Sequence, residues 1–334
     1  MREAGLPELW ADHGEPGAFF NPWNEDPKTF FGVLRWWFLT PNPHDKSQAP
    51  EVPVVANDGA YLAGFHNPPS LTWVGHATLA IHDGDDVILT DPHFGKRALI
   101  PARNQPPGIP IESIPDDAFA VISHNHYDHL DAYTVDTLPD TVQWFVGLGM
   151  ADWFRARGRE RVVELDWWQS ATRGRWTITC LPAQHWTRRF GQGTNEVLWC
   201  SWLIDSGVTR YYFSGDTGYF EGFAEFRKRF GPIDVAILAI GAYEPRWFMK
   251  YQHMNPEEAY RAFGDLGARY MVPMHWGTFD LTDEPIDLAP RVLEEVVEES
   301  GGDPTRVRTL AIGERWFVPK LQSGSQATQR SGVE

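Results

Sequence analysis

The chain has 334 residues, 42% of them hydrophobic, and its 45 Asp and Glu outnumber its 29 Lys and Arg to leave a net charge of −16. This acidic balance excludes nucleic acid as the expected partner, because phosphate binding needs Lys and Arg gathered on one face. The two cysteines, Cys180 and Cys200, are too few for a disulfide scaffold or a cysteine-based zinc site.

Neither a signal peptide nor a membrane span is predicted. Residues 1–17 are acidic and lack an apolar segment. No uncharged apolar run reaches the ~18 residues needed to cross a bilayer. We therefore expect a cytoplasmic protein.

Residues 1–70 are predicted to form an irregular, aromatic-rich N-terminal extension that wraps the core. Their densest apolar cluster is Phe30–Leu39, and residues 41–58 read as a loop. The cluster has two interpretations. It packs on the core, or it makes peripheral contact with a membrane surface.

The core domain is predicted to span residues 71–320, because short β-rich runs begin near Leu71. These runs are 71–74, 78–82, 86–90, 119–123, 143–146, 162–165, 176–181, 197–204, 210–213, 235–240 and 270–273. The predicted strands follow one another in groups that are separated by helices. This order indicates two mixed β-sheets packed together with helices outside. Residues 321–334 are rich in Ser, Gln and Gly, which predicts a disordered tail.

Helical patterns are fewer. They cover residues 152–157, 220–230 and 289–299, and a further helix is predicted to begin at Asn255-Pro256 and end near residues 264–267. Asn255 is a good N-cap, Pro256 suits the first helical position, and the acids that follow favour the first turn.

The strongest chemical signal is the run His124-Asn125-His126-Tyr127-Asp128-His129, which follows the apolar strand at 119–122. Imidazoles and carboxylates are costly to cluster unless they are solvated or share a cation. A turn at a strand end can aim His124 and His126 at one metal, and Asp128 and His129 at a second. These ligands suit zinc, although iron and manganese accept them too.

Three later residues of ligand type also follow predicted strands. They are His185, Asp216 within Ser214-Gly215-Asp216-Thr217-Gly218, and His275. A lone His after a strand is weak evidence, but three such residues after the first run predict a shared site.

This pattern resembles the metallo-β-lactamase superfamily and, within it, the N-acyl-phosphatidylethanolamine-hydrolysing phospholipase D family. The segments that carry the resemblance are 72–78, 123–131, 164–168, 184–186, 215–219, 240–256 and 275–279, of which 241–253 is the most specific. The resemblance extends weakly to 21–23 and 34–36. The resemblance implies an α/β fold, namely an αββα sandwich of two mixed β-sheets flanked by helices. It also implies that residues 71–320 are the catalytic domain, and suggests a homodimer.

By this resemblance, His124, His126 and His185 hold one zinc ion, Asp128, His129 and His275 hold a second, and Asp216 bridges the two. A metal-bridging hydroxide would then be the nucleophile. This sequence departs from the family where Ala132 intervenes before Tyr133, and it matches poorly over the N-terminal region.

Other residues near the predicted site have supporting roles or purely structural ones. Asp91 either orients a ligand histidine or only forms a turn before Pro92. His253 either contacts phosphate and protonates the leaving group or is structural. His76 supports the cleft or lies in a hairpin. Arg246, Lys250 and Arg188 are candidate phosphate partners.

Three functions are consistent with these residues. The resemblance implies a phosphodiesterase of phospholipase D type that acts on N-acyl-phosphatidylethanolamine or a related phospholipid. The alternative is a same-fold hydrolase of a small soluble substrate, such as a lactone or sugar-phosphate lactone. A non-catalytic lipid-binding module is a third interpretation, which the intact ligand set disfavours.

Overall fold

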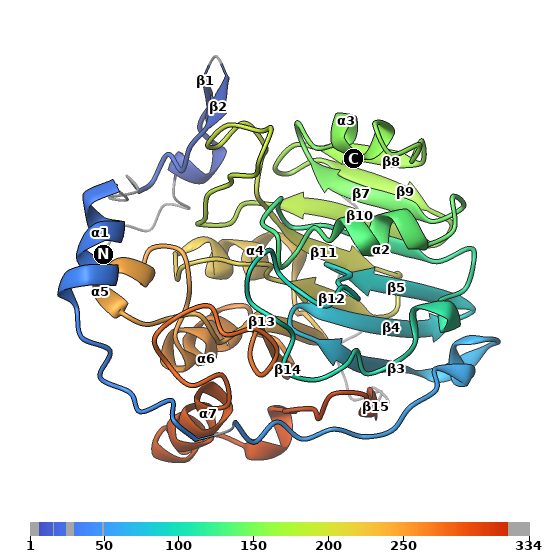
Figure 1. Cartoon of the computed structure of the whole chain (residues 1–334). Helices are drawn as coiled ribbons and strands as arrows, with labels where there is room; N and C mark the ends of the chain where they lie inside the picture. The colour runs from blue at the N-terminus through green and yellow to red at the C-terminus, as the bar shows by residue number, and fades with distance from the viewer. Residues whose placement is uncertain (1–6, 16, 25–29, 49, 320–334) are drawn as a thin grey trace.

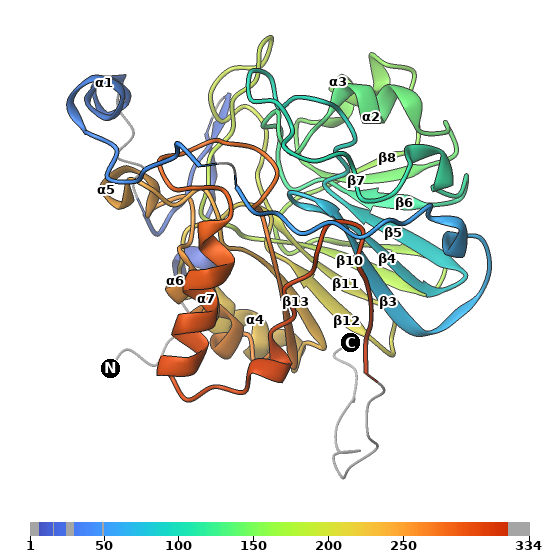
Figure 2. The ribbon, with the colours of Figure 1, turned by 60° about the horizontal axis from the view of Figure 1, so that its bottom comes forward.

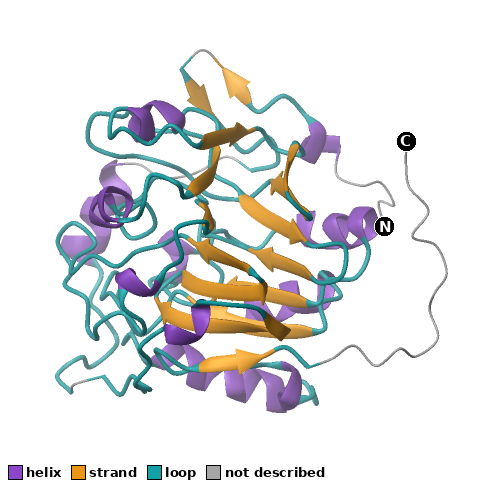
Figure 3. Ribbon diagram, turned by 90° about the vertical axis from the view of Figure 1, so that its right-hand side faces the viewer, coloured by secondary structure: helices purple, strands orange, loops and turns teal. Residues whose placement is uncertain are grey.

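Two β-sheets stacked face to face form the centre of the molecule (Figures 1 and 3). The computed structural model describes residues 7–15, 17–24, 30–48 and 50–319. The predicted tail at 321–334 lies outside these residues.

The first sheet has seven strands in the order β15-β3-β4-β5-β6-β7-β8. Their bounds are Arg315–Phe317, His66–Gly75, Thr78–Gly84, Asp86–Thr90, Phe119–Val121, Gln143–Gly147 and Val162–Leu165. The pairings from β15 to β5 are antiparallel, and those from β5 to β8 are parallel. The sheet is therefore mixed, as predicted.

The second sheet has six strands in the order β14-β13-β12-β11-β10-β9. Their bounds are Tyr270–Met274, Val235–Ala239, Arg210–Phe213, Ser201–Asp205, Trp176–Leu181 and Ser170–Arg173. The pairings from β9 to β12 are antiparallel, and those from β12 to β14 are parallel. A separate two-stranded ribbon, β1 (Gly14–Glu15) and β2 (Ala18–Phe19), lies near the start of the chain.

Helices cover both outer faces of the sandwich (Figure 2). Helices α2 (Ala132–Thr137) and α3 (Ala151–Arg155) lie on the side of the seven-stranded sheet. Helices α4 (Gly222–Phe230), α6 (Pro256–Asp265) and α7 (Leu288–Glu299) lie on the other side. This arrangement confirms the predicted αββα sandwich.

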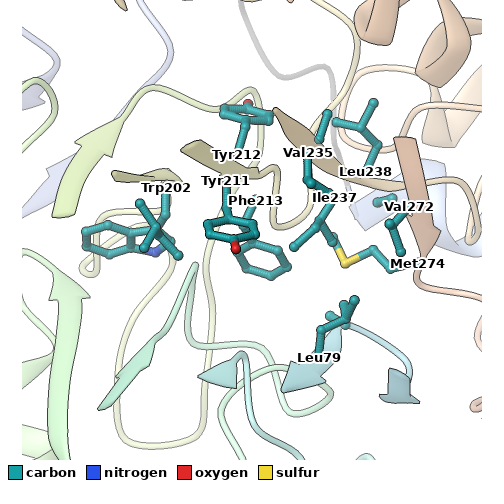
Figure 4. Packing of buried hydrophobic residues seen from close by; sticks show 14 of the residues in the cluster. Leu79, Trp202, Tyr211, Tyr212, Phe213, Val235, Ile237, Leu238, Val272 and Met274 are labelled. Carbon is teal, nitrogen blue, oxygen red and sulfur yellow. The ribbon is translucent and has the colours of Figure 1, made fainter. Parts of the chain in front are cut away.

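Alternating side chains build the core of the sandwich. Phe119 and Val121 of β6 belong to the cluster between the sheets, whereas Ala120 belongs to a second cluster under α2 and α3. Both faces of this strand are buried, so its apolar run is continuous. Between the sheets, Leu79 of β4 packs toward Met274 of β14 (Figure 4).

The predicted helices are largely confirmed. Asn255 caps α6 with a full capping box, in which its side chain accepts from the N–H of Glu258 and the Glu258 side chain accepts from the N–H of Asn255. Two predictions were wrong. The Phe30–Leu39 cluster is a helix, α1, rather than irregular chain, and the strand predicted at 197–204 begins only at Ser201 because residues 197–200 run without pairing in a sheet.

Strand direction brings the candidate residues together. Because β10 pairs antiparallel with β11, and β11 with β12, strand β10 runs parallel to β12, β13 and β14. By the same reasoning β3 runs parallel to β5 and β6. The loops that follow these strands in each sheet therefore leave from a common edge, and they carry the residues described next.

Candidate metal centre

Three imidazoles form the first group in the candidate centre. His124 and His126 lie in the turn after β6, and His185 follows β10. His126 Nδ1 is 2.9 Å from His124 Nε2 and 3.2 Å from His185 Nε2. Two nitrogens bound to one tetrahedral zinc at about 2.0–2.1 Å would lie about 3.3 Å apart, so these three converge as ligands of one ion do.

The second group adds a carboxylate. His129 Nε2 and His275 Nε2 lie 3.2 Å apart, and Asp128 Oδ2 is 3.4 Å from the first and 3.5 Å from the second. His76, in the turn after β3, places its Nε2 2.9 Å from the same Asp128 oxygen. These four side chains form one cluster that could hold a metal ion.

Asp216 lies between the two groups, in the loop after β12. Its carboxylate oxygens are each 3.1 Å from a ring nitrogen of the second group, on His129 and on His275. On the other side, Oδ2 is 3.8 Å from His124 Nε2 and 3.9 Å from His185 Nε2. One carboxylate thus faces both groups, as a bridging ligand must.

The chemistry of this cluster fits metal ions. His124, His129, His185, Asp216 and His275 are all buried, and burying so many ionisable groups is unfavourable unless a cation or protons balance the carboxylates. Neutral imidazole and carboxylate are also the donors that zinc prefers when thiolates are lacking.

Asp91, at the end of β5, orients two of the imidazoles. Its Oδ2 lies 2.6 Å from His129 Nδ1 and accepts a 2.5 Å hydrogen bond from Ser123 Oγ. Ser123 Oγ is in turn 2.9 Å from His124 Nδ1. These contacts turn Nε2 of both rings toward the cluster, which is how carboxylates commonly support metal-binding histidines.

His185 is oriented by the backbone instead. Its Nδ1 donates to the carbonyl of Gln252 over 3.0 Å. A carbonyl can only accept, so the proton is on Nδ1 and the lone pair of Nε2 faces His126 and Asp216.

The pKa values within the cluster follow from this crowding. Burial alone would raise the pKa of Asp216, yet His129, His275 and His253 hold it well below its usual range. Burial would lower the pKa of His275, but Asp216 and Asp128 raise it to about 9. Burial lowers the pKa of His124, and the neighbouring imidazoles lower it further. Protons and metal cations therefore compete for the space beside these carboxylates.

The structure places His253 at the rim of the cluster. Its Nδ1 is 3.8 Å from Asp216 Oδ2, and it groups with His185 and Asp216. His253, His126 and Asp128 are partly exposed, unlike the other members. The cluster is therefore open to solvent on the side of these three residues.

Of the three candidate phosphate partners, Arg246 has its guanidinium engaged by protein groups. Arg246 pairs with Glu258 over 2.8 Å and donates to the backbone carbonyl of His253 over 3.0 Å, so its guanidinium is committed to the start of α6. Lys250 places its ammonium 4.8 Å from the centre of the Tyr251 ring. Arg188 is exposed on the loop after His185.

Sequence reasoning missed three supporting residues. Ser123 and Gln252 contact ring nitrogens of the cluster as described above. Arg189 donates from Nη1 to the carbonyls of Asn125 and Leu130, at 3.0 Å and 2.9 Å, and so holds the turn with His124 and His126. Ser123 is next to His124 in the chain and could have been suspected, whereas the other two contacts join loops distant in sequence.

A cluster of buried imidazoles and carboxylates that could bind metal ions, at one edge of a two-sheet sandwich, is typical of one class of protein. The molecule is a metal-dependent hydrolase of the metallo-β-lactamase fold. A solved structure of the same fold, Igni18, described as a novel metallo hydrolase from the archaeon Ignicoccus hospitalis, aligns with a TM-score of 0.56 at 22% identity, over 74% of this chain and 97% of that one.

Sequence comparison identifies the family. The model described as the beta-lactamase superfamily domain matches residues 87–276. N-acyl-phosphatidylethanolamine-hydrolyzing phospholipase D 1 of Caenorhabditis elegans is 39% identical over 277 residues, which cover 75% of this chain and 77% of that protein. The mitochondrial enzyme of the same description from Saccharomyces cerevisiae is 34% identical over 264 residues, 75% of this chain and 56% of that protein. The chain belongs to the metallo-β-lactamase superfamily, in the family of these phospholipase D relatives.

Among the described residues, no helix is both long enough and apolar enough to cross a membrane.

Proposed function

We propose that the protein is a binuclear zinc phosphodiesterase of phospholipase D type that acts on N-acyl-phosphatidylethanolamine or a related phospholipid. The observation that carries this proposal is the position of Asp216 between two groups of imidazoles. The two relatives named for this activity supply the substrate class.

In the proposed reaction, the oxygen of water attacks phosphorus, and the P–O bond between phosphorus and the N-acylethanolamine oxygen breaks. Two bound metal ions would lower the pKa of the attacking water and neutralise charge on the phosphoryl oxygens. His124, His126 and His185 would hold one ion, Asp128, His129 and His275 the other, and Asp216 both. Phosphatidate and an N-acylethanolamine are the products.

His253 is proposed to move the proton. Its imidazole lies at the partly exposed rim, and Arg246 holds its backbone carbonyl. It is therefore placed to donate a proton to the leaving ethanolamine oxygen. Asp91 is proposed to act through His129 and His124 by holding their rings.

The test is hydrolysis of defined lipids by protein reconstituted with zinc. Mixed micelles of N-acyl-phosphatidylethanolamine should yield phosphatidate and N-acylethanolamine, and micelles of unacylated phosphatidylethanolamine should show whether the acyl group is required. The absence of product from every N-acylated phospholipid, at two zinc ions per chain, would contradict the lipid substrate. Hydrolysis of lactones in the same preparation would then favour the small soluble substrate.

We further propose that α1 contacts the membrane that carries the substrate. Phe31, Trp37, Phe38 and Leu39 are 78%, 68%, 75% and 77% exposed. Trp36 anchors the helix on the site side, because its Nε1 donates to Asp283 over 3.0 Å and its ring lies 5.4 Å from that of Phe248 in α5 (Arg246–Met249). Figures 1 and 2 show α1 beside α5, the helix that precedes His253.

Vesicle sedimentation tests this contact. Replacing Trp37 and Phe38 by Ser should release the protein from zwitterionic vesicles, with little dependence on salt because the contact is apolar and the chain is acidic. Val208→Ser is the matched control, since Val208 is also exposed but lies between β11 and β12, at the opposite edge of the sheet from Asp216. If the Trp37/Phe38 variant sediments with vesicles as fully as the Val208→Ser variant does, α1 has no role in membrane contact.

A further inference from the structure

A short N-terminal segment, Asn21 to Trp23, lies against the loop that carries His185. The Asn21 Nδ2 donates to the carbonyl of His185 over 3.0 Å, and its Oδ1 accepts from Trp199 Nε1 over 3.2 Å. The Trp23 Nε1 donates to Gln184 Oε1 over 3.0 Å. Two side chains separated by more than 160 residues from this loop thus bind two adjacent residues of it.

Gln184 connects this loop to the other segments of the site. Its backbone N–H donates to Thr217 Oγ1 and its carbonyl accepts from the N–H of Gly218, each over 2.9 Å. Its Nε2 donates to the carbonyl of Tyr251, also over 2.9 Å. The bond from Trp23 fixes the Gln184 amide so that Nε2 faces Tyr251. Through Gln184 the segment reaches the loop of Asp216 and the chain before His253.

The segment and the residues before it are also held by ring stacking and a polar contact that do not involve the candidate metal ligands. Trp23 stacks on Phe220 with ring centres 5.1 Å apart. Further toward the N-terminus, Trp10 stacks on Trp168 at 3.9 Å, and His13 Nε2 lies 2.8 Å from Asp166 Oδ1. Because the segment is anchored independently, Asn21 and Trp23 can restrain the loop rather than move with it.

We infer that Asn21 and Trp23 are positioning residues that hold His185 in the geometry needed for metal binding. This inference rests on the proposed function in one respect, namely that His185 is a metal ligand. The carbonyl of Gln252 fixes the rotation of the His185 ring, and Asn21 fixes the backbone from which the ring projects. Without that restraint, Nε2 would sample positions away from His126, and the affinity for the ion would fall.

The test compares three variants by zinc affinity, measured by competition with a chromogenic chelator. Asn21→Leu removes both hydrogen bonds at similar volume, and Trp23→Phe keeps the stacking on Phe220 but removes the bond to Gln184. Each should weaken zinc binding at the site of His124, His126 and His185 by about tenfold. Trp10→Phe is the matched control, because it replaces a Trp of the same N-terminal region by Phe, keeps an aromatic ring on Trp168 and leaves the hydrogen bonds of Asn21 and Trp23 in place. It should bind zinc as the wild type does.

Hydrogen exchange gives a readout independent of activity and of metal. In metal-free protein, the amides of Gln184 and Gly218 should exchange faster in Asn21→Leu and in Trp23→Phe than in Trp10→Phe. Wild-type zinc affinity and wild-type exchange in both variants would overturn the inference.

A fourth variant separates this inference from the proposed function. If His185→Ala retains both zinc ions at wild-type affinity, the proposed ligand role of His185 is wrong, and the inference falls with it. If His185→Ala loses zinc while Asn21→Leu and Trp23→Phe do not, the positioning role alone is wrong.

Discussion

Asp216 is the residue on which the proposed chemistry depends most. It is buried, and its carboxylate contacts His129 and His275 while facing His124 and His185. Asn has a similar shape but cannot supply a negative charge to two cations.

Asp216→Asn should therefore reduce hydrolysis by at least about 100-fold, more than the loss typical of residues that only orient ligands. Zinc content after dialysis should fall from two ions toward one. Asp152→Asn, an exposed carboxylate paired with Arg155 on α3, is the control and should leave both quantities unchanged. Full activity and full zinc content in Asp216→Asn would refute the bridging role.

His93 makes stability depend on pH. Burial lowers its pKa to about 4, against the partly compensating charge of Asp131. The unfolded chain has a pKa near 6.5 at this position, so the native state binds fewer protons between pH 6.5 and 4 and acidification favours unfolding. This contribution to stability is present above pH 6.5 and is lost as the pH falls toward 4.

The size of the effect is up to about 1.4 kcal/mol per pH unit for one proton. Between pH 6.5 and 5, urea unfolding of the wild type should lose about 1–2 kcal/mol more than that of His93→Gln, which lacks the titrating group. Both proteins keep the ionisable cluster of the candidate metal centre, so the difference between them reports His93 together with its interactions with Asp128 and His129. If the free energy of unfolding changes with pH in the same way in both proteins, burial does not lower the pKa of His93.

At the scale of secondary-structure elements, close approach of backbones sets the position of His275. Gly241 follows β13, and a Cβ at this position would lie 2.0 Å from the carbonyl oxygen of His275 after β14. Backbone cannot move aside as a flexible side chain can. The loop after β13 must therefore shift, and His275 with it, if Gly241 gains a side chain.

Gly241→Ala should lower the free energy of unfolding by about 1–3 kcal/mol, the usual cost of overpacking, and should weaken zinc binding. Gly264→Ala is the same substitution within α6, where nothing lies within 4 Å of the added carbon. It should instead stabilise the protein by roughly 0.5–1 kcal/mol, because Ala is the better helix former. Denaturant unfolding and metal analysis of both variants test the contrast, and equal effects would count against the backbone contact.

At the scale of the whole molecule, the candidate metal centre draws its residues from both sheets. His124, His126, Asp128 and His129 follow β6 of the seven-stranded sheet, whereas His185, Asp216 and His275 follow β10, β12 and β14 of the six-stranded sheet. Ions bound between them stabilise only the folded chain, because the unfolded chain does not bring the ligands together.

Removal of metal should therefore lower the melting temperature. At free zinc about 1,000 times the dissociation constant, each site contributes about 4 kcal/mol. Calorimetry measures the melting temperature with zinc and with a strong chelator. The difference between the two melting temperatures should be smaller in Asp216→Asn than in the wild type. If the chelator strips the metal but leaves the melting temperature unchanged, the ions do not join the sheets.

The fold class and most elements were predictable because they depend on local pattern. The apolar strand at residues 119–122 and the cap at Asn255 are readable from a few neighbouring residues, and the structure confirms both, with the strand ending at Val121. Helix α1 was missed because it carries a single polar side chain, Arg35, among apolar residues and a glycine, which leaves no helical periodicity to read.

The run from His124 to His129, together with His185, Asp216 and His275, was sufficient to predict a shared site, because each residue follows a strand and ligands gather at strand ends. The structure brings all seven together, and their binding of zinc stays a prediction. Only the tertiary structure decided which groups support them. Asp91 reaches His129, Gln252 reaches His185 and Asn21 reaches the His185 carbonyl from parts of the chain whose proximity no local pattern encodes. Sequence spacing specifies side chains within a turn or a strand, but contacts between distant loops depend on how the two sheets stack and on the directions in which their strands run.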